Sequence, residues 1–205
     1  MTFFVLASGP SLCREDIKAV RTRRGRKDRT IAVNTTFRAA PWADYLYAAD
    51  WQWWDEHEKV VCCLDSERVS LRRPLQNPAV DREIEYRVAT GLGHSRIHTG
   101  TDDQTPRGGN SGLQAINLAF LLGAREIVLL GFDCGHTYGR RHWHGDHPEG
   151  LGNAQRPDLW AASFPKIARD LAEAGVKVWN CSRETRLDCF DRLPLHDWFE
   201  RYRGS

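Results

Sequence analysis

The segment Gly108–Asp133 constrains the fold most, because it predicts a loop, a helix, a tight turn and a buried strand in immediate succession. Asn110 and Ser111 are both good helix N-caps. Apolar side chains then recur at helical spacing, and Gly123 stands where a glycine would end the helix. The apolar run 127–130 is typical of a strand that is buried on both faces, as in a parallel sheet.

Strand-like runs and helical patterns alternate along the whole chain. The predicted strands cover residues 2–7, 30–33, 44–49, 60–64, 85–89, 127–130 and 176–179. Further helices are predicted from Ser11 as N-cap to about residue 23, over 51–58 and over 157–174, where Pro165 bends the helix or marks its true start. This order predicts an α/β fold, a Rossmann-like, mostly parallel sheet with helices on both faces. The length of 205 residues fits a single domain over 1–205, with the His- and Gly-rich segment 134–156 as a lid or active-site loop.

Polar side chains follow the predicted strands at the points where the strands end. Ser8 and Asn34 follow such runs directly, Asp50 follows the run 44–49, and Asp133 lies just past the run 127–130. Ligands of open α/β sheets bind at this edge, so we expect Ser8, Asn34 and Asp133 to meet there. After the first strand comes a sharp turn and then a helix, an arrangement that can cradle phosphate. The residues of this turn, all predicted to bind the ligand, are Ser8, Gly9, Pro10 and Ser11.

A second anion site is predicted at the start of the central helix. Asn110, Ser111 and Gly112 would offer backbone N–H groups and the positive end of the helix dipole to a phosphate or carboxylate. The alternative is that these residues only cap the helix and shape a turn. Neither the GxGxxG fingerprint nor a GK[ST] phosphate loop is present.

The segment His142–His147 reads HxHxDH and allows three interpretations. One histidine, His142, His144 or His147, could act as a general base or stabilise phosphate charge. Alternatively the three histidines and Asp146 could bind zinc, as imidazole and carboxylate ligands do. The motif also resembles that of metallo-β-lactamase-like hydrolases. That fold needs further ligands downstream, where only His196 remains as a histidine. The third interpretation is a structural or solvated loop.

The composition limits the class of partner and the cellular location that we expect. A net charge of +2 does not favour nucleic acid as the partner, although the basic run 21–29 could touch phosphate. The six cysteines form no CxxC pair, and we expect them to be reduced. No apolar segment is long enough to span a membrane, and the first residues run straight into a strand, so we expect a cytoplasmic protein without a signal peptide. Most of the eight tryptophans should pack, while one could stack on a base or sugar.

The motif GPSL at 9–12, Asn34, and the pattern from Ser111 to Asp133 resemble two groups of Rossmann-like proteins. One comprises bacterial CMP-sialic acid-dependent sialyltransferases. The other comprises motility accessory factors and 6-hydroxymethyl-dihydropterin pyrophosphokinases. The resemblance implies that residues 8–11 and 110–112 contact the donor, that Asn34 contacts the nucleotide, and that Asp133 ends the corresponding strand.

The chain departs from the sialyltransferase pattern in three places. Ser8 stands where that family usually has Asn, and Asn110 stands where it has Thr. The family's catalytic histidine would fall near Pro157, Asp158 and Trp160, where this chain has none, and a loop histidine could substitute.

The leading hypothesis is therefore a nucleotide- or nucleotide-sugar-dependent transferase with a small-molecule or glycan acceptor. Asn34 would read the ribose or base, Asp133 would orient substrate or a divalent cation, and a loop histidine would assist proton transfer. The alternatives are a pyrophosphokinase that needs ATP and Mg²⁺, a zinc-dependent hydrolase, and a non-catalytic nucleotide-binding module. No cofactor is predicted apart from Mg²⁺ in the kinase alternative.

Overall fold

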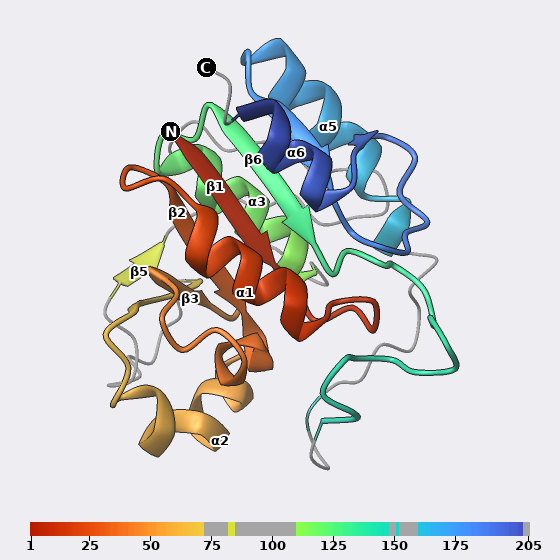
Figure 1. Cartoon of the computed structure of the whole chain (residues 1–205). Coiled ribbons are helices and arrows are strands. Elements are labelled where there is room, and N and C mark those ends of the chain that lie inside the picture. Colours follow the sequence, from red (N-terminus) through yellow and green to blue (C-terminus); the bar gives the residue numbers. More distant parts are fainter. Residues whose placement is uncertain (72–81, 85–109, 148–150, 152–159, 203–205) are drawn as a thin grey trace.

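The computed structural model describes residues 1–71, 82–84, 110–147, 151 and 160–202 (Figure 1). Its centre is an eight-stranded sheet of order β5-β4-β3-β2-β1-β6-β7-β8, in which every neighbouring pair is parallel. The strands are β1 (Thr2–Leu6), β2 (Arg29–Val33), β3 (Tyr45–Tyr47), β4 (Glu67–Leu71), β5 (Arg82–Ile84), β6 (Glu126–Leu130), β7 (Lys177–Asn180) and β8 (Asp191–Arg192). The predicted α/β class with a parallel sheet is confirmed.

The strand order reverses at β1. From β1 the chain builds β2 to β5 outwards on one side, and it then returns to place β6 on the other side of β1. Val5 consequently pairs with Ile31 of β2 and with Leu129 of β6. In open α/β sheets the crevice beyond the carboxyl ends of the strands at such a switch point is the usual ligand site.

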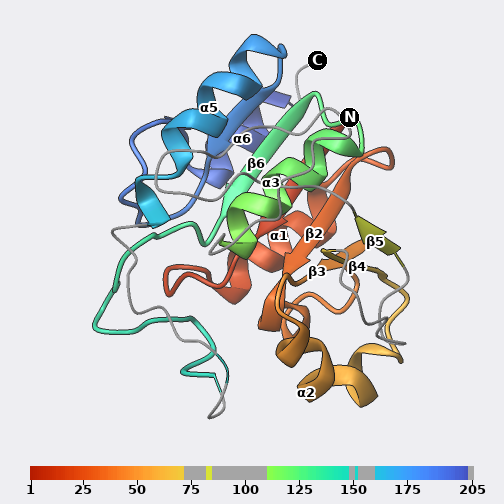
Figure 2. The same ribbon diagram turned by 180° about the vertical axis from the view of Figure 1, so that it is seen from behind.

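Helices cover both faces of the sheet, as the sequence predicts. Side chains alternate along each strand, so that Phe3 and Val5 face one core and Phe4 and Leu6 face the other. The helices are α1 (Arg14–Arg23), the 3₁₀ helix η1 (Asn34–Arg38), α2 (Trp51–Val61), α3 (Ser111–Leu121), α5 (Phe164–Glu173) and α6 (Leu195–Tyr202). The helices α3 and α5 cover the first core and α1, α2 and α6 the second, which is seen by comparing Figure 1 with Figure 2.

The predicted strand 60–64 is wrong. Val60 and Val61 end α2, which buries Trp53, Trp54, His57 and Val61 on one side at helical spacing. The fourth strand in chain order is β4, which lies instead at Glu67–Leu71. The predicted strand 85–89 lies outside the described residues.

The boundaries of two other helices also differ from expectation. Cys13, not Ser11, is the N-cap of α1, and it makes no side-chain capping bond. The helix predicted over 157–174 is described from Trp160 onwards, and its regular part begins at Phe164 with Pro165 in the first turn, so the proline marks its start. Among the described helices, none is long and apolar enough to cross a membrane.

Candidate functional site

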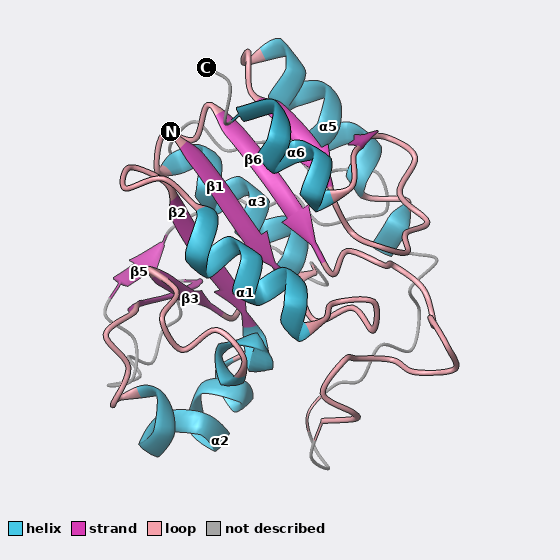
Figure 3. Ribbon diagram, viewed as in Figure 1, coloured by secondary structure: helices cyan, strands magenta, loops and turns pink. Residues whose placement is uncertain are grey.

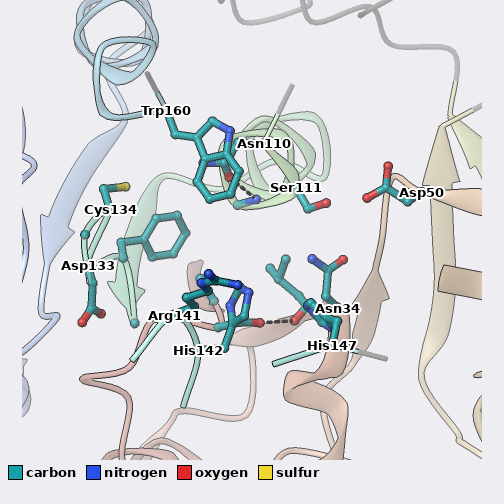
Figure 4. A pocket seen from close by; sticks show the side chains of 18 residues that line it. Asn34, Asp50, Asn110, Ser111, Asp133, Cys134, Arg141, His142, His147 and Trp160 are labelled. Carbon is teal, nitrogen blue, oxygen red and sulfur yellow. Dashed lines mark hydrogen bonds between the residues drawn. The ribbon is translucent and has the colours of Figure 1, made fainter. Parts of the chain in front are cut away.

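A cavity of about 230 Å³ lies at the carboxyl edge of the sheet, next to the switch point between β1 and β6. We call it the edge crevice. Of the residues predicted from the sequence, those that line it are Ser8, Gly9, Asn34, Asp50, Asn110, Ser111, Gly112, Asp133, His142 and His147. Figure 4 shows Asn34 of η1, Ser111 of α3 and His142 and His147 of the loop after β6 around a shared space. Residues up to about 139 positions apart in the chain, such as Ser8 and His147, thus meet in space.

The backbone N–H groups of the turn after β1 make hydrogen bonds within the protein. Gly9 N donates to Gly131 O (2.9 Å), Leu12 N donates to Gly9 O (3.1 Å), and Ser11 N donates to a carboxylate oxygen of Asp133 (2.9 Å). These N–H groups are therefore occupied, and Pro10 has none. The phosphate cradle at this turn stays a prediction, for which Ser8 and Gly9 line the crevice whereas Pro10 and Ser11 do not.

Asp133 fastens this turn to the end of β6. One of its oxygens accepts from Ser11 N and the other from Ser11 Oγ (2.7 Å), and the side chain is buried. Burial raises the pKa of Asp133, against the opposing effect of hydrogen bonds from Thr137 and Ser11. The contacts give Asp133 a positioning role, while the substrate- or cation-orienting role stays a prediction.

Asn34 and Ser8 form the floor of the edge crevice. Asn34 follows β2 with a φ of +50°, a left-handed conformation that is uncommon outside glycine, and its Oδ1 is buried without a hydrogen-bond partner. Ser8 Oγ lies 3.3 Å from Val33 O and 3.2 Å from Thr36 Oγ1. The amide oxygen of Asn34 is thus a crevice group with unused hydrogen-bonding capacity.

The start of α3 carries a side-chain N-cap and a hydroxyl group that borders the crevice. Asn110 Oδ1 accepts from Gly112 N (2.7 Å) and Leu113 N (3.2 Å), so two of the first N–H groups are satisfied internally. A Cβ on Gly112 would lie 3.1 Å from a ring carbon of Phe132, which favours glycine there. The capping interpretation of Asn110 is confirmed, and Ser111 with the helix dipole remains for a ligand.

Arg141 and Trp160 also line the edge crevice, although the sequence analysis did not assign either to it. The guanidinium of Arg141 lies 3.6 Å from the carboxylate of Asp146, and both side chains are largely exposed. Trp160 faces the start of α3 (Figure 4). A tryptophan able to stack on a ring is expected from the composition, but no local pattern identifies which one.

The loop after β6 (Figure 3) brings three histidines together. The ring centroids lie 5.2 Å apart for His142 and His144, 4.8 Å for His142 and His147, and 4.9 Å for His144 and His147. Burial lowers the pKa of all three, to about 3 for His144 and about 4 for His147. Asp146 is not in this group and its carboxylate lies beside the guanidinium of Arg141, so its place in a zinc site stays a prediction. His144 does not line the crevice.

Trp143 anchors the histidine loop to the crevice floor. Its backbone N donates to Ser8 O (3.1 Å), and its ring Nε1 donates to Thr36 Oγ1 (3.3 Å). The histidines on either side of Trp143 are thereby held beside the ends of β1 and β2.

No family model and no curated protein matches the chain. One solved structure with similarity is thiamin pyrophosphokinase from Geobacillus thermodenitrificans, at a TM-score of 0.37 and 12% identity, over 66% of this chain and 48% of that one. The match thus spans about half the length of that protein. A TM-score this low carries no argument about function, and neither family resemblance drawn from the sequence is established by it.

Proposed function

We propose that the protein is a transferase that binds a nucleotide in the edge crevice, with ATP-dependent pyrophosphoryl transfer to a small acceptor as the leading reaction. The observation that carries the proposal is the convergence of Ser8, Asn34 and Ser111 on one cavity at the switch point of a parallel sheet. This is where doubly wound folds hold phosphorylated nucleosides.

The charges around the cavity suit a phosphate chain. The start of α3 supplies the positive end of a dipole and the Ser111 hydroxyl, and Arg141 supplies a guanidinium. Trp160 offers an aromatic face to a base. The unpartnered Oδ1 of Asn34 would accept a hydrogen bond from a base amine or a ribose hydroxyl.

Asp50 favours pyrophosphoryl over glycosyl transfer. It lines the cavity at the start of α2 and is exposed. A carboxylate beside a phosphate site is a suitable oxygen ligand for Mg²⁺, which phosphoryl transfer from ATP requires. In this reaction an acceptor hydroxyl oxygen attacks the β-phosphorus of ATP, the bond from that phosphorus to the α–β bridging oxygen breaks, and AMP leaves while the hydroxyl proton passes to a base.

Glycosyl transfer from a nucleotide-sugar is the second candidate, because neutral imidazoles of His142 and His147 border the same cavity and could take the proton of an acceptor. The missing histidine near residues 157–160 counts against the sialyltransferase version of this reaction.

A thermal-shift screen against ATP, AMP, CMP, CDP and UDP, with and without Mg²⁺, tests the proposal. A ligand at ~100 times its Kd stabilises the fold by about 2.7 kcal/mol, which raises Tm by about 5–11 °C for a chain of this size. Asn34→Ala and Ser111→Ala should abolish the shift, while Thr22→Ala, an exposed position on α1, should keep it. If no nucleotide moves Tm, or if both crevice variants respond like Thr22→Ala, the proposal is wrong. Release of AMP from ATP supports the first candidate, and release of CMP or UDP from a nucleotide-sugar supports the second.

A further inference from the structure

The three histidines of the loop after β6 offer a complete set of metal ligands. One ring nitrogen from each of His142, His144 and His147 can be chosen so that all three lie within 4.8 Å of one another. Tetrahedral zinc bound through imidazole at 2.0–2.1 Å would need these nitrogens about 3.4 Å apart. Side-chain rotation within the loop can supply that closure of about 1.4 Å without moving the sheet.

The local backbone explains why the histidines meet. His142 and His144 flank Trp143 in a turn, which Gly145 follows with a φ of +91°. Gly145 N donates to His142 O (3.3 Å), which closes the turn and returns His147 to its two partners. A side chain at position 145 would meet no steric obstacle within 4 Å, so this glycine is needed for its conformation and not for space.

Two ring nitrogens of the three histidines are left for a ligand. Nε2 of His142 and Nε2 of His144 are buried and have no hydrogen-bond partner. Buried polar atoms in native proteins are nearly always satisfied, so an unbonded pair side by side points to a group that both can bind. A metal ion fits, because it accepts lone pairs from several imidazoles at once.

We propose that His142, His144 and His147 form a three-histidine site for a zinc-class transition metal ion, with its open coordination position toward the edge crevice. Imidazole ligands without a carboxylate favour zinc, cobalt, nickel or copper over magnesium or calcium. Three protein ligands leave one tetrahedral position for water or substrate, as in catalytic zinc sites. His142 and His147 line the crevice and His144 does not, so we place that position on the side of the cavity.

This inference stands on the histidine geometry and does not require the nucleotide proposal. It does exclude the use of a metal-bound nitrogen as a general base, since a coordinated lone pair cannot accept a proton. A metal-bound water would then be the group on this wall of the crevice that gives up or takes a proton.

Equilibrium dialysis of chelator-treated protein against Zn²⁺, followed by elemental analysis, measures the site directly. We expect one zinc per chain for the wild type and for His136→Asn, an exposed histidine of the same loop outside the group. His142→Asn and His144→Asn should each weaken binding by at least about 100-fold, since even outer-shell changes cost 10–100-fold. Circular dichroism and Tm of the chelated variants establish that they fold.

Cobalt substitution supplies a second readout. A Co²⁺ spectrum with the strong visible bands of four- or five-coordination, lost in His144→Asn, supports the site. A spectrum like that of hydrated Co²⁺, full zinc retention in both histidine variants, or an equal loss in His136→Asn overturns the inference. His144→Asn also separates the two proposals, because His144 does not line the crevice: it should lose the metal and keep the nucleotide-induced rise in Tm.

Discussion

Gly9→Ala tests whether the turn after β1 is seated on the end of β6 as described. A Cβ at position 9 would lie 2.2 Å from Asp133 Oδ1 and 2.3 Å from Gly131 O. Contacts under 3.0 Å do not occur for real Cβ atoms, and a backbone oxygen cannot swing aside as a side-chain terminus can. The turn must therefore lift off the strand end by most of an ångström.

The cost follows from the bonds that such a movement breaks. The 2.9 Å bond from Gly9 N to Gly131 O is a neutral hydrogen bond, for which the net contribution is about 1 kcal/mol. The buried carboxylate of Asp133 accepts two bonds from Ser11, and the loss of one bond to a charged group costs about 2 kcal/mol. Gly9→Ala should thus reduce the free energy of unfolding by about 3 kcal/mol, which lowers Tm by about 6–12 °C.

Gly135→Ala is the matched control, because it adds the same methyl group at the same edge of the sheet. There the nearest atom, at 2.8 Å, belongs to the exposed side chain of Arg186, which can rotate away. We expect a change below about 1 kcal/mol for this variant in urea unfolding followed by tryptophan fluorescence. Equal stability of Gly9→Ala and Gly135→Ala would refute the described seating of the turn.

Three further predictions concern the cap, the thiols and a buried histidine. Asn110→Ala should lower the free energy of unfolding by about 1 kcal/mol and Tm by about 2–4 °C, because two N–H groups of α3 lose their acceptor. Asn110→Asp should retain most of the wild-type stability, since aspartate also caps helices. Equal losses of stability in the two variants would contradict the capping role. Only the exposed Cys62 and Cys63 should react quickly with a thiol reagent at pH 8, and more than two fast thiols would contradict this. Burial raises the pKa of the other four thiols, to about 11 for Cys13 and Cys189 and about 12 for Cys134 and Cys181. Burial lowers the pKa of His57 below the 6.5 of a free imidazole. As the pH drops below 6.5, His57 therefore binds a proton in the unfolded chain before it does so in the folded protein. The free energy of unfolding then falls, by at most about 1.4 kcal/mol per pH unit. His57→Phe should reduce this slope in pH-dependent urea unfolding while the exposed His196→Gln should not, and an unchanged slope in His57→Phe would contradict the burial effect.

The unit of α3 and β6 could be predicted because its signals are local and agree with one another. Asn110 caps the helix, Gly123 ends it with a φ of +89°, and the apolar run that follows is long enough for one buried strand. The fourth strand could not be placed for the opposite reason. The five residues 60–64 are apolar without a decisive period, and burial of Trp53, Trp54 and His57 selects a helix that no window of that length reveals.

The role of Ser11 depends on a contact that no local pattern encodes. A serine shortly before a helix predicts a cap, but its hydroxyl bonds to Asp133, which lies 122 residues away. The carboxylate is the stronger acceptor, and its burial at the end of β6 makes an unpaired state costly. The hydrogen bonds that satisfy the buried carboxylate of Asp133 therefore outweigh the preference of Ser11 for a helix N-cap.

The difference between local signals and long-range contacts also explains which crevice residues the sequence predicts. In a parallel sheet every strand ends at the same edge, so a polar residue after a strand, such as Ser8 or Asn34, is placed there by topology alone. A residue in a long loop has no such constraint, and Arg141 reaches the crevice only because Trp143 ties the loop to Ser8 and Thr36. The histidines can border the crevice for the same reason. Trp143 therefore holds the proposed metal site beside the proposed nucleotide site through its bonds to Ser8 and Thr36.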